Sequence, residues 1–154
     1  MKKILFLCAA TISFATAQTN SSISLTEVTR IENELAADAM QGRKLFTPGI
    51  DKASAFIEQE FAKIGLGYWG TLSNYRQEFQ IRGKAANNVI GVIPGKSKPN
   101  EYVVFSAHYD HLGTEPTGTD TVYNGANDDA SGVTAVIALA QYYKTLNNNE
   151  CTLI

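Results

Sequence analysis

Two stretches with helical spacing of apolar residues follow residue 20. The first begins at Ser24-Leu-Thr-Glu27, which has the form of a helix-capping box, and we expect it to end near Gly42. The second has Thr47 as N-cap, Pro48 at its first position and Gly65 at its end. The apolar faces consist of Val28, Ile31, Leu35 and Ala39 in the first stretch, and of Ala53, Phe56, Ile57, Phe61 and Ile64 in the second.

After a glycine-containing loop over residues 65–74, three segments have the character of strands. Residues 75–81 alternate apolar and polar side chains, which is typical of an edge or half-exposed strand. Residues 88–93 are apolar and stop at Pro94-Gly95. Residues 101–107 are apolar with little alternation, which predicts a central strand covered on both faces.

A third helical pattern covers residues 130–146, and residues 151–154 begin a further strand. The helix is indicated by the spacing of Val133, Val136, Ile137, Ala140 and Tyr143. Strands followed by a helix and another strand favour an α/β layer fold whose sheet is at least partly parallel. In such sheets the ligand site lies at the carboxyl ends of strands. His108 and Asp110 directly follow the segment 101–107 and therefore occupy that position.

The amino terminus has the pattern of an export signal. Lys2 and Lys3 precede an apolar run from Ile4 to Ala10, and the small residues of Ala15-Thr16-Ala17 form a cleavage site. We expect cleavage after Ala17, so that residues 1–17 are a signal peptide and residues 18–154 are exported to the periplasm or secreted. With 154 residues, 44% of them hydrophobic and 18% charged, the chain has the size of one modest globular domain.

Removal of residues 1–17 changes the charge and the cysteine content. It leaves 11 basic and 15 acidic residues, a net charge of about −4, which disfavours binding to nucleic acid or anionic membranes. Cys8 leaves with the signal, so Cys151 cannot form an internal disulfide. No other apolar run approaches the roughly 20 residues of a transmembrane helix.

Both histidines of the chain lie in the stretch "HYDH" at residues 108–111. His108 and Asp110 are two positions apart at a strand end, so an extended backbone places them on the same side. A carboxylate in that place can accept the second N–H of a histidine and fix its tautomer, as usually happens beside a metal. Taken alone, a hydrogen-bonded histidine at a strand end is an equally ordinary interpretation.

Asp128 and Asp129 lie at the start of the third helix, between Gly125-Ala126 and Ser131-Gly132. Small residues let the backbone turn tightly and approach an ion. Neighbouring carboxylates repel each other unless a cation lies between or beside them. A helix N-cap next to a solvated acid would explain the pair by itself. Together with His108, and with a connection of 18 to 20 residues that can fold back to one sheet edge, the acids favour a site for a divalent metal.

These motifs resemble metallopeptidase family 28, the exported zinc aminopeptidases and their glutaminyl cyclase relatives. The resemblance runs over nearly all of the mature chain. It is carried by "LAADAMQGRKLFTPG" at residues 35–49, by "FAKIGL", "YRQEFQ" and "NNVIGVIPG", and above all by "VVFSAHYDHLG" followed by "NGANDDASG".

The resemblance implies a three-layer zinc-exopeptidase fold, of the phosphorylase/hydrolase-like type, with a mixed and partly parallel sheet. It implies that His108 binds one zinc ion, that Asp110 orients His108, and that Asp128 bridges two zinc ions. Asp129 follows a peptide bond that is often cis in the family. Arg43 and the turn Thr47-Pro48-Gly49 match structural positions. His111 matches no ligand position, and we expect it to be an exposed loop histidine.

The implied activity is that of an exopeptidase that removes amino-terminal residues from peptides by means of a metal-activated water. Glutaminyl cyclase chemistry on one zinc ion is the alternative, and a non-catalytic relative is a third. The intact His108, Asp110 and Asp128 count against the third. Only about six residues, 82–87, separate two strands at the place where larger relatives carry a protease-associated domain, so we expect no such insert.

The remaining family ligands and the glutamate general base lie, in the family, beyond the strand that begins at Cys151. Glu150 precedes that strand, so we do not assign it as the base. We expect residues 18–154 to be the amino-terminal portion of one catalytic domain, truncated at its carboxyl end. A catalytic zinc normally has three protein ligands, so this portion alone should bind metal loosely and be inactive. The side-chain preference stays open, because Tyr68, Trp69 and Tyr123 have equally good interpretations as packing residues.

Overall fold

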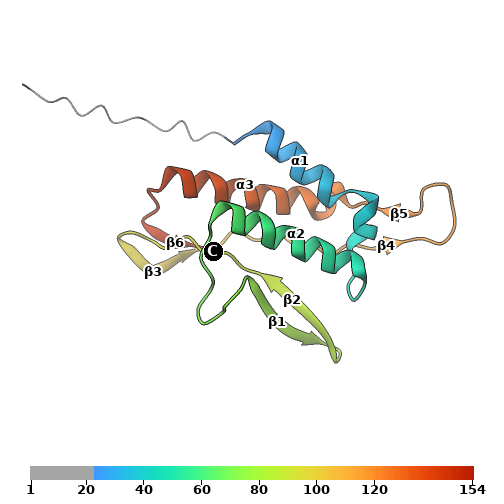
Figure 1. Cartoon of the computed structure of the whole chain (residues 1–154), viewed down its shortest axis with the longest axis horizontal. Helices are drawn as coiled ribbons and strands as arrows, with labels where there is room; N and C mark the ends of the chain where they lie inside the picture. Colours follow the sequence, from blue (N-terminus) through green and yellow to red (C-terminus); the bar gives the residue numbers. More distant parts are fainter. Residues whose placement is uncertain (1–22) are drawn as a thin grey trace, which may run out of the picture.

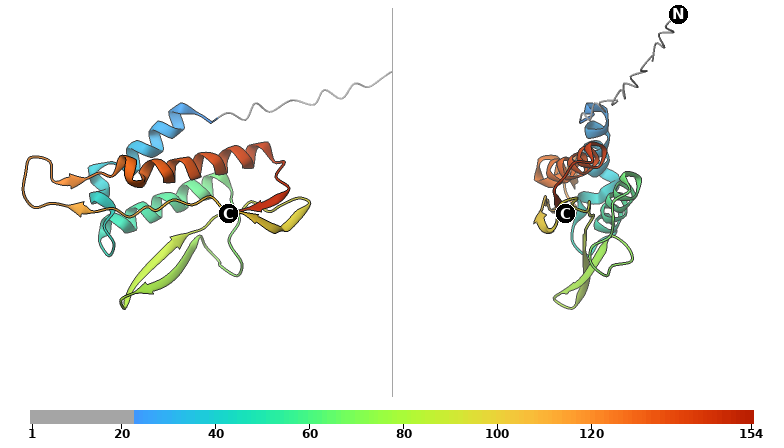
Figure 2. Two further views of the ribbon diagram at one scale, coloured as in Figure 1. Left: turned by 180° about the vertical axis from the view of Figure 1, so that it is seen from behind. Right: turned by 90° about the vertical axis from the view of Figure 1, so that its left-hand side faces the viewer.

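The computed structural model describes residues 23–154, and helices and strands form separate layers in it (Figure 1). The predicted signal peptide, residues 1–17 with Cys8, lies outside the described residues. The helices α1 (Leu25–Leu35), α2 (Pro48–Ile64) and α3 (Ser131–Leu146) gather on one side of the strands, as the end-on view in Figure 2 also shows. Within residues 23–154, no helix has the length and apolar character needed to cross a membrane.

Helix α1 begins as predicted but ends earlier. The Ser24 hydroxyl accepts a hydrogen bond from the Glu27 amide at 3.4 Å, which caps the helix. The helix ends at Leu35 and is followed by a 3-10 segment, η1 (Asp38–Arg43), so the predicted end near Gly42 is wrong. The Arg43 side chain donates to the Leu35 carbonyl and the Asn124 side chain donates to the Ala36 carbonyl, so these two carbonyls do not accept the backbone bonds of a longer helix. Ala39, predicted to face the core, is exposed.

Helices α2 and α3 match their predicted ranges. Helix α2 ends at Gly65, whose φ of +75° is left-handed, and α3 begins one residue later than predicted, after the short π-type turn η2 (Ala126–Ala130). Thr47 does not cap α2 with its side chain; its hydroxyl donates to the Lys44 carbonyl at 2.7 Å. The apolar faces of the helices and the inner strand residues form one core: Ile31, Leu35, Met40, Ala53, Ile57, Phe61, Leu66, Tyr75, Ile93, Ala130, Val133, Ile137 and Leu153.

The first two strands form a hairpin. Strand β1 (Arg76–Ile81) has its predicted range and pairs antiparallel with β2 (Lys84–Val89). The turn consists of Arg82 and Gly83, both with positive φ, which is the two-residue geometry that suits a hairpin. The second strand therefore begins at Lys84, earlier than the predicted residue 88. Beyond it, only single bridges, Gly67 to Val92 and Ile93 to Leu153, continue the pairing.

The later strands combine parallel and antiparallel pairing. Strand β3 (Lys98–Val103) runs parallel to β6 (Cys151–Leu153), while Ile93 bridges Leu153 in the antiparallel sense. The prediction of a mixed, partly parallel sheet is confirmed. A small ribbon of β4 (Gly113–Thr114) and β5 (Val122–Tyr123), which the sequence did not predict, lies near the amino end of α3.

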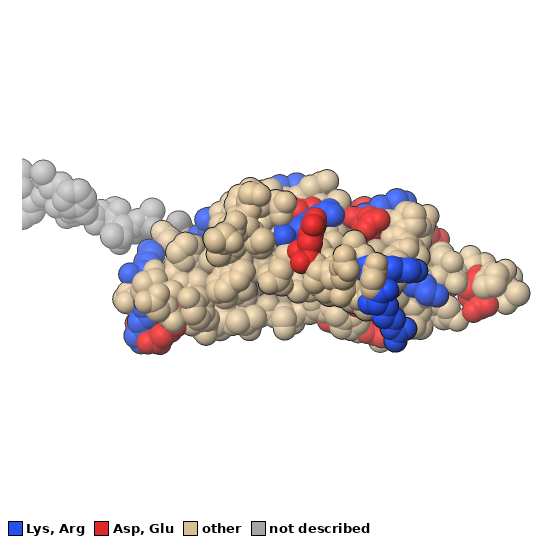
Figure 3. Space-filling model, turned by 90° about the horizontal axis from the view of Figure 1, so that it is seen from below, with Lys and Arg blue, Asp and Glu red and all other residues tan. Residues whose placement is uncertain are grey.

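The prediction that residues 101–107 are covered on both faces is wrong. Tyr102, Val103 and Val104 are 53, 42 and 62% exposed. The helices lie on one side of the strands, and uncharged residues make up most of the surface seen in Figure 3. Phe105 does reach the helical layer, because its ring stacks on the Tyr143 ring of α3 with the ring centroids 5.9 Å apart.

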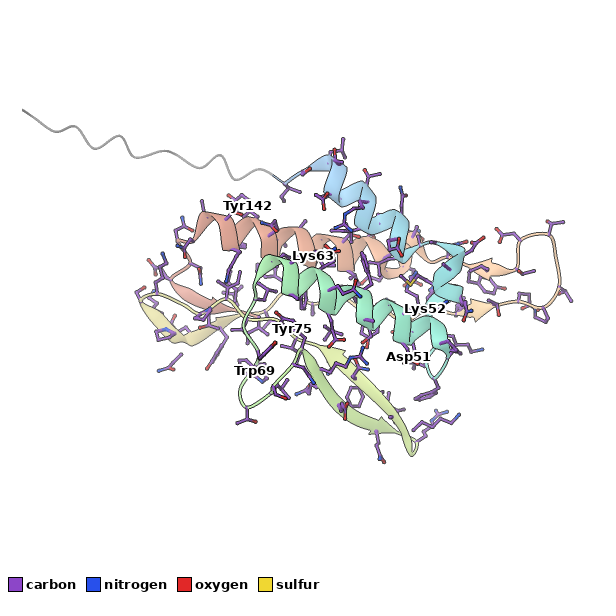
Figure 4. All side chains as sticks on the ribbon, in the orientation of Figure 1. Asp51, Lys52, Lys63, Trp69, Tyr75 and Tyr142 are labelled. Atoms are coloured by element: carbon purple, nitrogen blue, oxygen red, sulfur yellow. The ribbon has the colours of Figure 1, made fainter. Side chains whose placement is uncertain are left out.

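Two of the three aromatic residues whose role the sequence left open, Tyr68 and Trp69, contact other aromatic rings, whereas Tyr123 is 44% exposed. The Trp69 and Tyr102 rings pack edge-on with their centroids 5.7 Å apart. The Tyr68 and Tyr75 rings do the same with their centroids 4.8 Å apart. Tyr75 is buried, and its hydroxyl donates to the Leu66 carbonyl at 2.9 Å. Figure 4 labels Trp69, on the loop between α2 and β1, and Tyr75, which directly precedes β1.

Arg43 is fully buried and joins four parts of the chain. Its Nε donates to the Tyr109 carbonyl at 2.9 Å. Its Nη1 donates to the carbonyls of Leu35 at 2.5 Å and Asn124 at 2.6 Å. Its Nη2 donates to the Gly125 carbonyl at 2.8 Å. The guanidinium thus fastens the end of α1 to the segments on either side of the β4–β5 ribbon.

The backbone at Arg43 is shaped for this contact. Gln41, Gly42 and Arg43 all have positive φ, of 52°, 62° and 47°. A glycine is required at position 42, because a Cβ there would collide with the carbonyl of Gly113. Burial lowers the pKa of Arg43, and nearby carboxylates, Glu32 foremost, oppose that shift. An arginine remains cationic in proteins, so the carbonyl oxygens around it replace its water shell.

We predict that Arg43→Met lowers the free energy of unfolding by at least about 3 kcal/mol, because each buried carbonyl left without a donor costs about 1–3 kcal/mol. Urea unfolding followed by circular dichroism measures the change. The matched control is Arg76→Met, which removes a partly exposed arginine paired with Glu58 at 2.7 Å and should cost about 1 kcal/mol or less. Equal losses in the two variants would show that Arg43 has no special structural role.

Candidate metal centre

His108, Asp110 and Asp128 come together although 20 positions separate the first from the last. His108 and Asp110 lie on the segment that follows β3, and Asp128 lies in the turn η2 before α3. The His108 Nε2 is 3.1 Å from Asp128 Oδ1. The His108 Nδ1 is 3.4 Å from the Asp110 carboxylate and 3.1 Å from the Asp110 carbonyl. One ring nitrogen of His108 therefore faces Asp110, and the other faces Asp128.

The three side chains are open to solvent, with exposed fractions of 55, 43 and 61%. Partial burial lowers the pKa of His108, but the Asp110 carbonyl and the carboxylates of Asp110, Asp129 and Asp128 outweigh it, so the net pKa is raised. The negative potential that raises the pKa of His108 also attracts a metal cation. The site therefore has the electrostatic character of a cation site.

Asp129 has a role that the sequence did not reveal. Its Oδ1 accepts from the Gly132 amide at 3.1 Å and its Oδ2 accepts from the His108 amide at 3.2 Å. Asp129 thus ties the backbone of His108 to the first turn of α3. A Cβ at position 132 would collide with this carboxylate, which explains the glycine there. The Asp128–Asp129 peptide bond is cis.

The prediction that His111 is an exposed loop histidine is wrong. Its side chain is only 11% exposed, and its Nδ1 lies 3.6 Å from Asp128 Oδ2. The Arg43 carbonyl accepts from the His111 amide at 3.0 Å and turns the loop inward. Gly125, with a φ of 60°, leaves room for the imidazole ring. Sequence alone gave no signal for this burial, because it depends on the contact with Arg43.

The donor pair fits a zinc ion. Imidazole nitrogen and carboxylate oxygen are common zinc ligands, and bonds of about 2.0–2.1 Å at tetrahedral angles place two ligand atoms about 3.3 Å apart. The observed separation of 3.1 Å between His108 Nε2 and Asp128 Oδ1 is close to that value. Across residues 23–154, no three His, Cys, Asp or Glu side chains are arranged to hold a metal ion. The described part of the chain therefore offers a partial ligand set.

A cavity of about 350 Å³ adjoins the candidate centre. His108 and Asp110 form part of its lining. Apolar side chains from the turn before α2, from α2 itself and from the hairpin form much of the rest, including Leu45, Phe46, Ile50, Phe79 and Ile81. A larger cavity, of about 450 Å³, lies among α1, α2 and α3 and is lined by none of the candidate ligands. The smaller cavity is thus the one placed to receive a molecule bound at His108.

The chain resembles a known protease family and several proteins named as proteases in sequence. The family model described as "Peptidase family M28" matches residues 88–154. A "Probable zinc metalloprotease" of Pyrenophora tritici-repentis is 30% identical over 103 residues, which are 62% of this chain and 21% of that protein. A "Vacuolar membrane protease" of Schizophyllum commune is 30% identical over 97 residues, which are 63% of this chain and 9% of that protein. The chain thus spans about a fifth or less of the length of these relatives.

Solved structures share the fold. A Zn-dependent exopeptidase from Parabacteroides distasonis aligns with a TM-score of 0.60 at 17% identity, over 85% of this chain and 45% of that one. LapB from Legionella pneumophila aligns with a TM-score of 0.61 at 23% identity, over 89% of this chain and 36% of that one. Tannerella forsythia glutaminyl cyclase aligns with a TM-score of 0.62 at 16% identity, over 86% of this chain and 46% of that one. The fold is that of the zinc exopeptidases and glutaminyl cyclases, and residues 88–154 are similar to peptidase family M28.

Proposed function

We propose that this chain contributes the first part of a zinc-dependent exopeptidase site that removes amino-terminal residues from peptides. The observation that carries the proposal is the 3.1 Å approach of His108 Nε2 to Asp128 Oδ1, with Asp110 on the far side of the imidazole. In this proposal His108 is a zinc ligand, Asp128 is the carboxylate that bridges two zinc ions, and Asp110 is the residue that orients His108.

Bound zinc would supply a Lewis acid and an activated water molecule. Asp110 attracts a proton on His108 Nδ1, which leaves the lone pair of Nε2 directed toward Asp128 and the metal position. Asp129 holds the His108 backbone against α3, so the imidazole is presented from a fixed point. The adjoining apolar cavity offers space for part of a bound peptide.

We further propose that residues 18–154 alone bind metal loosely and do not turn over substrate. A catalytic zinc usually has three protein ligands, and His108 with Asp128 provide two donors. In this proposal the remaining ligands and a general base come from a longer form of the chain, since the curated relatives are much longer. The substrates would be peptides with a free amino terminus, met after export to the periplasm or the exterior.

Glutaminyl cyclase chemistry is the second candidate. The fold likeness to the Tannerella forsythia enzyme, at a TM-score of 0.62, is as good as the likeness to the exopeptidase, at 0.60. His108, Asp110 and Asp128 suit either chemistry. The number of zinc ions bound by a form with all its ligands distinguishes them, because two ions favour the peptidase.

We predict that zinc binds weakly to the chain through His108 and Asp128. His108→Ala and Asp128→Ala should each lower the zinc affinity at least about tenfold, since even the loss of a ligand's supporting partner has an effect of about 10–100-fold. Isothermal titration calorimetry measures the affinity. Glu115→Ala, which removes an exposed carboxylate outside the site, should bind zinc like the unaltered chain. Unchanged affinity in the His108 and Asp128 variants would refute the site.

We also predict that the 154-residue chain does not hydrolyse a leucyl reporter amide, with or without added zinc. A longer form that carries the remaining ligands should hydrolyse it, lose the activity on chelation and regain it with zinc. A spectrophotometric assay of amine release measures both forms. Hydrolysis that survives chelation, or that is unaffected by His108→Ala, would contradict the zinc exopeptidase proposal, and turnover by the 154-residue chain would contradict its proposed inactivity.

A further inference from the structure

His111 is a partly enclosed histidine beside the candidate centre, and the proposed chemistry gives it no role. Its side chain is 11% exposed, whereas that of His108 is 55% exposed. An imidazole with so little contact with water normally has a polar partner, because a buried polar group without one costs free energy. The carboxylate of Asp128 lies 3.6 Å from its Nδ1.

The two imidazoles approach different oxygens of the same carboxylate. His108 Nε2 lies 3.1 Å from Asp128 Oδ1, and His111 Nδ1 lies 3.6 Å from Asp128 Oδ2. The second distance is slightly longer than a direct hydrogen bond, so the contact is electrostatic as it stands. A small rotation of the carboxylate would bring Oδ2 within hydrogen-bond range. Asp128 is thus held between two histidines, with one oxygen for each.

The place of His111 is fixed by its backbone and by its neighbours. The Arg43 carbonyl accepts from the His111 amide at 3.0 Å. The Arg43 guanidinium donates to the Gly125 carbonyl at 2.8 Å and to the Asp128 carbonyl at 3.4 Å. The His111 ring lies against Gly125, where a Cβ would come within 2.6 Å of the ring. One buried arginine therefore holds the backbone of both His111 and Asp128, and the distance between them is set by that frame.

We propose that His111 is a positioning residue that orients the Asp128 carboxylate toward the metal. With a proton on Nδ1, His111 attracts Oδ2 and leaves Oδ1 directed toward His108 and the ion. Without this donor the carboxylate, which is 61% exposed, is free to rotate away from His108. The inference rests on the proposed zinc site at His108 and Asp128, and it adds a residue outside the ligand set.

Two substitutions separate donation from packing. His111→Asn places an amide nitrogen near the position of Nδ1 and keeps a donor to Asp128, while His111→Phe keeps a ring of similar shape and removes the donor. Zinc affinity is measured by calorimetry on the 154-residue chain, and the ring nitrogens of His108 are followed by NMR during the titration. We expect His111→Phe to weaken zinc binding about tenfold and to reduce the zinc-dependent shift of His108 Nε2. His111→Asn should stay within about threefold of the unaltered chain, a change of less than about 0.7 kcal/mol.

The remaining outcomes each decide the matter. Equal zinc binding by His111→Phe and the unaltered chain overturns this inference and leaves the zinc site intact. Equal losses in His111→Asn and His111→Phe also overturn it, because the ring itself would then be a ligand or a packing element. If His111→Phe does not fold in a urea titration, His111→Gln replaces it, since its amide lies near Nε2 and should fail to support Asp128. Absence of any zinc-dependent shift at His108 in the unaltered chain overturns the proposed site and this inference with it.

Discussion

The contact on which the site depends most is the buried guanidinium of Arg43. It donates to backbone carbonyls of Leu35, Tyr109, Asn124 and Gly125, and no carboxylate of residues 23–154 forms an ion pair with it. A planar group with five N–H donors suits this task, because its fork reaches several carbonyls at once and lysine cannot reproduce that geometry. The contact ends α1, seats the loop that carries the histidines, and holds the turn before α3, so local structure and site geometry have one cause.

The candidate centre combines this buried frame with an open surface. The backbone of His108 is tied to α3 through Asp129, and the backbone of His111 is tied to Arg43, whereas the carboxylate of Asp128 remains 61% exposed. Preorganised ligands that face solvent suit a metal site, since an ion must enter and substrate must reach it. The His108 ring lies between the carboxylates of Asp110 and Asp128, so these two acidic groups do not face each other directly.

Local signals predicted the parts of the fold that local forces determine. Helix α2, between Pro48 and Gly65, and strand β1 have the ranges that capping, periodicity and alternation indicate. His108 meets Asp128 as expected, although β3 ends at Val103 and not at the predicted residue 107. The end of α1 at Leu35 and the burial of His111 involve Arg43, whose contacts reach from Leu35, eight positions away, to His111, 68 positions away. The early start of β2 depends on Arg82 taking a left-handed conformation, which a non-glycine residue adopts only in a suitable turn.

The most direct test of a zinc site at His108 and Asp128 is an anomalous difference map, measured at the zinc absorption edge, from crystals of the chain equilibrated with zinc. The site described here predicts a peak about 2.0–2.2 Å from both His108 Nε2 and a carboxylate oxygen of Asp128. Occupied zinc peaks elsewhere, with His108 and Asp128 left in direct contact with each other, would contradict it.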